Sequence, residues 1–377
     1  MNIDSALKKE GIRVIGQLNT REINKIATNI SKKIAEAFPE HGINQRDLFD
    51  SISRLNMFIA EMPNDTAVAK YFYKNNSIYF SSTYDLSDLN TLALHECLHF
   101  MQELKSRSGR LLRLGLYNLE MPIHHGMALN EAAVQQMASI ATGEKLDTVK
   151  YYNMEFSTQS PNFYPILTAL LNEMIYFTGS YPLYHSTLYS NDVFKNTFSL
   201  KSSSRAYSKI ESNFDLILTY ENLLSEEVNK LAACSEDINN IGKIRKINSK
   251  IADYKKIILN KTIETQNLII SNCFTSEYNS IKTMADISNF ELSLQTFKSV
   301  MITTKDYNFY DDYCKNIIEK LDEKREFILK YGNILTLDSI TKELSRVEEQ
   351  TYGFQFFKRL FHKLKLLVED ALREKEL

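Results

Sequence analysis

The distribution of proline constrains the fold of this chain more than any other feature. All six prolines lie before residue 183, and the following 195 residues contain only three glycines, Gly242, Gly332 and Gly353. Proline breaks helices because it lacks an amide proton and its ring clashes with the preceding turn. A segment of this length without proline is predicted to be mostly helical. We therefore expect a mixed N-terminal region followed by a long helical region.

Apolar residues in the second half recur at steps of three and four, which favours long antiparallel helices or a short coiled coil. The residues and segments with this pattern are Ile247, Ile251, Tyr254, Ile258, 307–331 and 337–372. The basic stretch 354–367 carries one apolar stripe, so we expect it to pack on the helical domain rather than dock on a membrane surface or partner helix. The polar run 201–204 separates the predicted domains 1–200 and 201–377.

Charge and composition exclude several classes of protein. The chain is 44% hydrophobic and 24% charged, which is typical of a globular protein, and its net charge of −2 gives no basic field for nucleic acid. The N-terminus has no apolar signal core, and Asn172 and Glu173 interrupt the most apolar window, 164–177. No CxxC pair occurs among the four cysteines. We expect a cytoplasmic protein with no transmembrane segment and no nucleic-acid partner.

The first half shows helix caps and short strands. Asn19 and Glu22 form a capping-box pattern before a helical repeat that ends at Pro39. Strands are predicted at 70–73 and 77–80, joined at Asn75-Asn76. Further helices are predicted at 46–55, from 85 or 87 to about 105, at 126–142 and at 161–177. The chain is thus predicted to be α+β and predominantly helical, with a small mixed sheet in its first domain and an all-α second domain.

Residues 95–99 read His-Glu-Cys-Leu-His, an HExxH motif within a predicted helix. Residues four apart share a helix face, so His95 and His99 can bind one metal ion while Glu96 lies beside it. Zinc lowers the pKa of a bound water to about 7, and a neighbouring carboxylate can take its proton as the water attacks a carbonyl. Cys97 is interpreted as a small core residue rather than a ligand.

A catalytic zinc usually takes three protein ligands. Gln102 and Lys105 exclude the HExxHxxGxxH pattern, but Asn130 and Glu131 form an Asn-Glu pair on the next predicted helix. HExxH followed by a helix with Asn-Glu-Ala resembles the gluzincin, thermolysin-like branch of the zincin metallopeptidases. The resemblance covers about residues 55–145.

The resemblance implies a zincin-like metallopeptidase domain at 1–200. It implies Zn²⁺ bound by His95, His99 and Glu131, with Glu96 as general base. It also makes the strand 77–81 the active-site edge strand, which would hold an extended peptide by β-addition. One position departs from the family, because Gln135 stands where an Asp orients a ligand histidine. Gln135 can accept the same hydrogen bond but supplies no charge.

Alternatives for the third ligand are His124, His125 and Glu173, ranked by ligand type after Glu131. A donor to the developing oxyanion is expected in the run 180–185, beyond a predicted helix end. His185 is the first choice and Tyr184 the second, ahead of Tyr151 and Tyr152.

Three functions follow from these residues. The first is a zinc metallopeptidase acting on a peptide or protein substrate. The second is a degenerate zincin that acts as a regulatory or scaffolding protein, binding a partner or itself through the C-terminal helices. The third is a zincin-type toxin or effector with one protein target.

Overall fold

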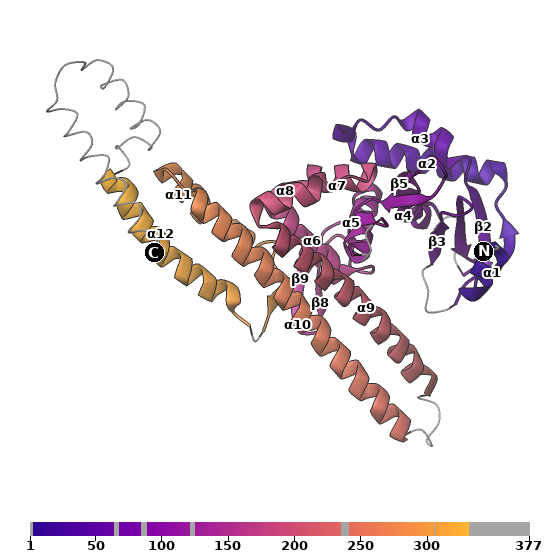
Figure 1. Ribbon diagram of the computed structural model, residues 1–377. Coiled ribbons are helices and arrows are strands. Elements are labelled where there is room, and N and C mark those ends of the chain that lie inside the picture. The colour runs from indigo at the N-terminus through magenta and orange to yellow at the C-terminus, as the bar shows by residue number, and fades with distance from the viewer. Residues whose placement is uncertain are drawn as a thin grey trace, which may run out of the picture. The chain divides into compact units, whose positions relative to one another are not determined.

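The computed structural model describes residues 3–63, 68–83, 89–120, 125–234, 241–305 and 307–331. The chain forms two compact units, one of Met1–Asn279 with Leu292–Cys314 and one of Ser280–Glu291 with Lys315–Leu377. Helices dominate the described residues, and small sheets lie in the N-terminal part (Figure 1). The predicted class, a predominantly helical α+β fold, is confirmed.

A four-stranded sheet forms the N-terminal end of the first unit. Its strands are β1 (Arg13–Gln17), β2 (Asn56–Glu61), β3 (Ala69–Phe72) and β4 (Ser77–Ser81), in the order β1-β2-β4-β3. The predicted pair is confirmed, because β3 and β4 are antiparallel. The prediction that 77–81 is the edge strand is wrong. Strand β4 also pairs in parallel with β2, so it lies inside the sheet and β3 is the edge.

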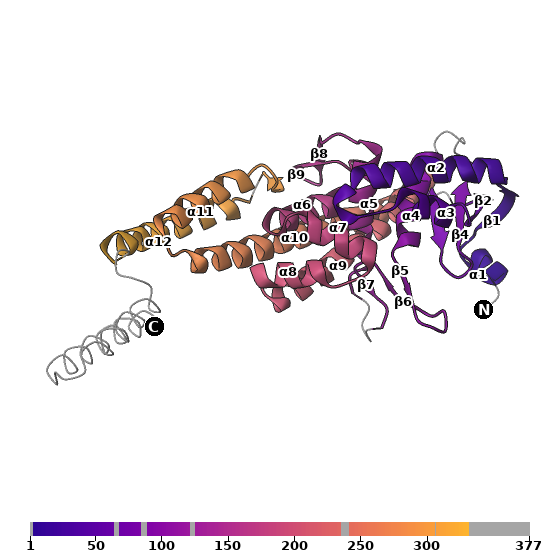
Figure 2. The same cartoon turned by 90° about the horizontal axis from the view of Figure 1, so that it is seen from above.

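Helices pack around this sheet. They are α1 (Ile3–Lys9), α2 (Thr20–Ala37), the 3₁₀ turn η1 (Pro39–His41) and α3 (Gln45–Ile52). The capping box at Asn19 and Glu22 is present, with both of its hydrogen bonds. Helix α2 lies beside the sheet in both Figure 1 and Figure 2. Its apolar stripe is buried, as the helical spacing of Ile26, Ile30 and Ile34 predicts.

Helix α4 (Leu89–Met101) carries the HExxH segment. It ends four residues earlier than predicted, because Glu103–Lys105 forms strand β5 instead of a further helical turn. Strand β5 pairs with β6 (Leu111–Leu114), which pairs with β7 (Tyr117–Asn118). The start of the predicted helix, at 85 or 87, lies outside the described residues.

Helix α5 (Met127–Thr142) carries Glu131 and keeps its predicted bounds. Gly126 and Gly143 flank it in the left-handed region. Gly126 has no side chain to cap the helix, so Asp215 of a later helix caps it instead. The Gly126 and Ala128 N–H groups donate to the Asp215 carboxylate at 3.0 and 2.9 Å. A carboxylate at a helix N-terminus is worth about 1 kcal/mol.

The middle of the chain forms a hairpin and three helices. These elements are β8 (Asp147–Tyr151), β9 (Met154–Thr158), α6 (Pro165–Thr178), α7 (Ser180–Tyr189) and α8 (Val193–Lys201), and β10 (Thr303–Thr304) extends the hairpin. The helix expected from 161 begins at Pro165, so its predicted start is wrong by four residues. The run 180–185 does lie beyond the end of this helix, and it forms the first part of the next helix, α7.

The remaining helices are α9 (Ser204–Cys234), α10 (Ile241–Ser280), α11 (Met284–Phe297) and α12 (Phe309–Tyr331). Helices α9 and α10 run antiparallel, as predicted: ion pairs join Lys209 to Glu264 and Glu227 to Lys250 at 3.2 and 3.1 Å. The predicted boundary at 201–204 falls between α8 and α9, inside the first unit, and stays a prediction. The segments 337–372 and 354–367 lie outside the described residues. None of the described helices has the length and apolar character needed to cross a membrane.

Candidate metal centre

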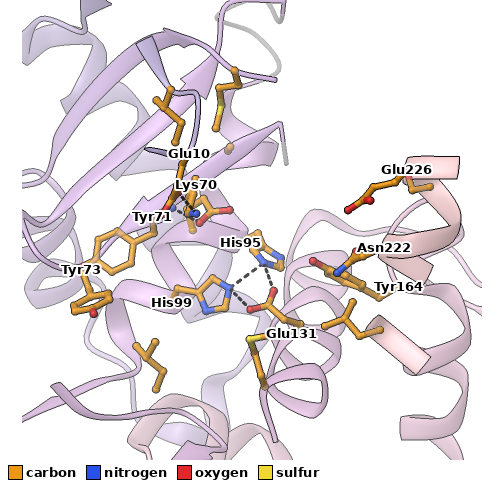
Figure 3. A pocket seen from close by; sticks show the side chains of 18 residues that line it. Glu10, Lys70, Tyr71, Tyr73, His95, His99, Glu131, Tyr164, Asn222 and Glu226 are labelled. Carbon is orange, nitrogen blue, oxygen red and sulfur yellow. Dashed lines mark hydrogen bonds and ion pairs between the residues drawn. The ribbon is translucent and has the colours of Figure 1, made fainter. Parts of the chain in front are cut away.

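Two helices bring a His-His-Glu group together. His95 and His99 lie one turn apart on α4, and Glu131 lies on α5, which packs against α4. The two imidazole Nε2 atoms are 3.0 Å apart, and each lies 3.4 Å from an oxygen of Glu131. The three ligating atoms all lie within 4.8 Å of one another. Figure 3 shows the three side chains pointing toward one another.

The face of α4 opposite the two histidines is buried in the core. Ala93, Leu94, Cys97 and Leu98 have no exposed surface. The prediction that Cys97 is a core residue is confirmed, and burial, with Glu96 nearby, raises the pKa of its thiol. A helix packed on this face holds the two histidines toward the pocket, because residues four apart share a side.

A glutamine amide oxygen lies against the Nδ1 atom of each histidine. Gln135 Oε1 is 3.0 Å from His95 Nδ1, and Gln102 Oε1 is 3.2 Å from His99 Nδ1. An amide oxygen only accepts hydrogen bonds, so each Nδ1 carries a proton when the ring is neutral. The lone pair is then on Nε2, the nitrogen that faces Glu131. Gln135 therefore fills the orienting position despite its lack of charge.

The charges of the group are strongly coupled. Burial alone would raise the pKa of Glu131, but the two histidines outweigh it and hold that pKa below its usual range. Burial alone would lower the pKa of His99, but the Glu131 and Glu96 carboxylates raise it to about 9. Two imidazole nitrogens and one carboxylate form a donor set that suits a divalent cation, and His₂Glu is one of the ligand sets of catalytic zinc sites. These residues therefore fit a metal ion.

Glu96 is buried beside this group, with 8% of its surface exposed. Its Oε2 accepts a hydrogen bond from the Tyr71 main-chain N–H at 2.5 Å. Because Tyr71 lies on β3, the edge strand and the HExxH helix are joined at this carboxylate. The main-chain N–H and C=O groups of successive residues in an edge strand point alternately toward and away from the neighbouring strand. Those of Ala69 therefore point to the same side as those of Tyr71.

The metal group and Glu96 line a cavity of about 680 Å³. Strand β3 forms one side of it through Ala69, Lys70 and Tyr71, and α9 contributes Leu218, Asn222 and Glu226. Figure 3 shows Tyr71 and Glu226 on opposite sides of the histidines. Lys70 is paired with Glu10, another residue of the cavity wall. The cavity is therefore bounded by an open sheet edge and by a helix of the predicted second domain.

Tyr164 also lines the cavity, and the sequence analysis did not identify it as a site residue. It interacts with the Glu131 carboxylate. Burial first, then Glu131 and Glu96, raises its pKa, so the hydroxyl stays protonated and can donate. Tyr164 adopts a left-handed conformation (φ 50°) directly before Pro165. Because residues before proline avoid helical angles, the Tyr-Pro pair was a sign that the helix begins at 165.

The predicted oxyanion donors lie elsewhere. His185 and Tyr184 do not line the cavity; they pack with His41 and Phe38 in an aromatic cluster. The run 180–185 belongs to α7, and these side chains pack against the rings of Phe38 and His41. Tyr151 and Tyr152, at the tip of the β8–β9 hairpin, also lie outside the cavity lining.

The two alternative third ligands that the structure describes, His125 and Glu173, have partners other than the histidine pair. His125 Nδ1 lies 3.5 Å from Asp215, at the start of α5. Glu173 is fully buried, and its Oε1 accepts from Gln266 Nε2 and the Ile302 N–H at 2.7 and 3.0 Å. Burial raises the pKa of Glu173 to about 8. His124 lies outside the described residues, so Glu131 is the candidate that the structure places beside the histidines.

Comparison of the chain with protein-family models, with curated proteins and with solved structures finds no match.

Proposed function

We propose that this protein is a zinc-dependent metallopeptidase that hydrolyses peptide bonds in a peptide or protein substrate. The observation that carries the proposal is the convergence of His95, His99 and Glu131 in a cavity that also contains Glu96 and an open sheet edge. Each component has a separate role in amide hydrolysis. The cytoplasmic location stays part of the proposal, with four free cysteines suited to a reducing compartment.

The metal would be held by the Nε2 atoms of His95 and His99 and by the Glu131 carboxylate. Zinc bound there would polarise the substrate carbonyl and lower the pKa of a water molecule to about 7. The HExxH spacing and the Asn-Glu pair support zinc through the resemblance to gluzincins.

Glu96 is the proposed general base. Its carboxylate would accept the proton of the attacking water and pass it to the leaving amine. The Tyr71 N–H fixes one carboxylate oxygen of Glu96, which leaves the other available for proton transfer. The Tyr164 hydroxyl, the protonated donor of the cavity wall, is the proposed hydrogen-bond partner of the developing oxyanion.

Strand β3 is the proposed docking edge for an extended substrate. The main-chain groups of Ala69 and the carbonyl of Tyr71 lie on the side of β3 away from β4. A peptide that adds to this edge would pass the histidine pair and Glu96. Helix α9 forms the opposite wall, so its residues would contact the substrate side chains. This enclosure favours a restricted set of substrates, and a toxin or effector with one target is a special case of the proposal.

Replacing Glu96 by Gln tests the proposal. The amide cannot take a proton, so hydrolysis of a quenched-fluorescent peptide library should fall by about 10²–10⁴-fold while bound zinc is retained. Glu61→Gln is the control for the same chemical change, since Glu61 is an exposed glutamate of β2 that pairs with Arg13 outside the cavity. Unchanged hydrolysis in the Glu96 variant would refute the role of Glu96.

One observation favours the alternative of a non-catalytic protein. The hydrogen bond from Tyr71 to Glu96 also joins β3 to α4, so it could serve folding alone. Under that alternative, wild-type protein binds zinc without hydrolysing any peptide of the library, and Glu96→Gln lowers only the melting temperature. The same measurement therefore separates the two functions.

A further inference from the structure

Behind His99 lies a buried pair of amide side chains. Gln102 Nε2 donates to Asn130 Oδ1 at 3.1 Å, and Asn130 Nδ2 donates to Gln102 Oε1 at 3.2 Å. The two residues have 1% and 3% of their surface exposed. Gln102 follows the end of α4 and Asn130 lies on α5, directly before Glu131. The pair therefore joins the two helices that supply the metal group.

A main-chain donor fixes the direction of every bond in this pair. The Leu116 N–H donates to Asn130 Oδ1 at 3.0 Å, and a main-chain N–H can only donate. Asn130 must then present its NH₂ to Gln102, which presents its own oxygen in return. That oxygen also faces His99 Nδ1 at 3.2 Å. The ring must donate to it, and the lone pair of a neutral His99 is consequently on Nε2.

The turn that supplies Leu116 is shaped to the amide pair. A Cβ atom added to Gly115 would lie 2.3 Å from Asn130 Oδ1 and 2.4 Å from Gln102 Nε2. Gly115 also has φ of +53°, a conformation that favours glycine. Only a glycine therefore lets the turn approach closely enough for the Leu116 N–H to reach Asn130.

Ser190 and Arg113 hold this turn in place. Ser190 Oγ accepts from the Gly115 N–H at 2.7 Å and donates to the Gln102 main-chain carbonyl. Arg113 Nε donates to the Gly115 carbonyl at 2.7 Å. Each main-chain polar group of Gly115 thus has a partner, and Ser190 at the end of α7 connects the turn to the end of α4.

We propose that Gln102 and Asn130 are positioning residues for metal binding, which select the His99 tautomer whose Nε2 lone pair faces the ion. Three hydrogen bonds connect the Leu116 N–H to His99 through Asn130 and Gln102. Because the Leu116 N–H can only donate, it sets which atom of each following group donates and which accepts. The inference rests on the proposed metal centre. It assigns to neutral amides the orienting task for which many metal sites use a carboxylate.

Zinc affinity measured by competition with a chelator, on the full chain, tests this role without any assay of hydrolysis. Gln102→Leu removes the acceptor for His99 Nδ1, and we expect zinc binding to weaken by about 10–100-fold. Gln136→Leu is the matched control: Gln136 is also a buried glutamine, but its Nε2 donates to Asn172, away from the histidines. Both variants should lose thermal stability, and only Gln102→Leu should lose zinc affinity.

Two further variants separate tautomer selection from packing. Gln102→Glu keeps an oxygen against His99 Nδ1, so zinc affinity should recover to within a few-fold of wild type. Asn130→Asp keeps the size of the side chain but replaces its donor by an acceptor. A carboxylate oxygen would then lie against Gln102 Oε1, and the repulsion between these two acceptors would displace the Gln102 oxygen from His99 Nδ1. Without this acceptor the His99 tautomer is no longer selected, and zinc binding should weaken by about tenfold or more.

The possible failures are distinguishable. If wild-type protein binds no zinc, the proposed function fails and this inference fails with it. If wild type binds zinc and Gln102→Leu binds it no more weakly than Gln136→Leu, the positioning role alone is overturned. Unchanged zinc affinity in Asn130→Asp would likewise overturn the proposal that this residue selects the His99 tautomer. The melting temperature of the metal-free variant shows whether it is folded.

Discussion

Two pairs of histidines lie in the first unit, and their surroundings differ. His95 and His99 each have an amide oxygen at Nδ1, and their Nε2 atoms face a shared carboxylate. His41 and His185 are stacked with ring centroids 6.0 Å apart, and His41 also stacks on Tyr181 at 4.7 Å. Among the described residues, the Nδ1 atoms of this second pair have no hydrogen-bond partner.

The difference shows what turns a histidine pair into a candidate ligand set. Burial lowers the pKa of His41, although Glu40 lies 3.3 Å from its Nε2. The pKa of His99 moves the other way, to about 9, because two carboxylates outweigh burial. The first pair faces a shared carboxylate, whereas the second pair is stacked among aromatic rings. Proximity of two imidazoles is therefore insufficient without oriented partners.

The largest effect that distinguishes the His-His-Glu group from the aromatic cluster around His41 and His185, the second cluster, is expected in kcat. Tyr164→Phe removes the hydroxyl proposed to stabilise the oxyanion, so kcat should fall by about 10²–10³-fold with zinc affinity unchanged. Tyr184→Phe is the matched control in the second cluster, a buried tyrosine outside the cavity. It should leave kcat within about twofold of wild type. Equal losses of kcat in Tyr164→Phe and Tyr184→Phe would contradict the proposed role of Tyr164.

A smaller effect is expected in the pH dependence of stability of the metal-free protein. His41 has a folded pKa below its unfolded value of about 6.5. Its contribution to the free energy of unfolding is therefore present above that pH and is lost as the pH falls. His99 has a folded pKa of about 9, so its contribution is full below about 6.5 and is lost as pH rises toward 9.

Denaturant unfolding of His41→Phe and His99→Ala against wild type, at pH 5 to 9, measures these contributions. The free energy of unfolding of His41→Phe relative to wild type should rise as the pH falls below about 6.5. The stability that His99→Ala loses relative to wild type should shrink as the pH rises above about 7. A stability difference between His41→Phe and wild type that stays constant across this pH range would contradict the lowered pKa of His41.

Much of the candidate metal centre could be predicted from sequence because its candidate ligands lie on two locally encoded helices. The spacing of His95 and His99 on one helix fixes their shared face, and the glycines that flank 127–142 give the bounds of the helix with Glu131. The long C-terminal helices followed from the absence of proline. In each case the feature depends on neighbours within one or two turns.

The features that were predicted wrongly or not predicted depend on contacts between residues far apart in the chain. Whether 77–81 is an edge or an interior strand is decided by pairing with β2, about twenty residues away. Tyr164 lines the cavity from a left-handed position directly before Pro165, together with residues of α4, α5 and α9 that are distant in sequence. His185 lies in the second cluster because 180–189 is helical. The role of Gln102 depends on Asn130 and on the turn at Gly115, which no local pattern indicates.

The zinc content of the purified protein, measured by elemental analysis, tests the central claim most directly. The set comprises wild type, His95→Ala, Glu131→Gln and, as the control from the second cluster, His185→Ala. We predict one zinc per chain in wild type and His185→Ala, loss of zinc in His95→Ala and weakened retention in Glu131→Gln. A wild type without metal, or a metal content indifferent to His95 and Glu131, would contradict the assignment of these residues as a metal centre.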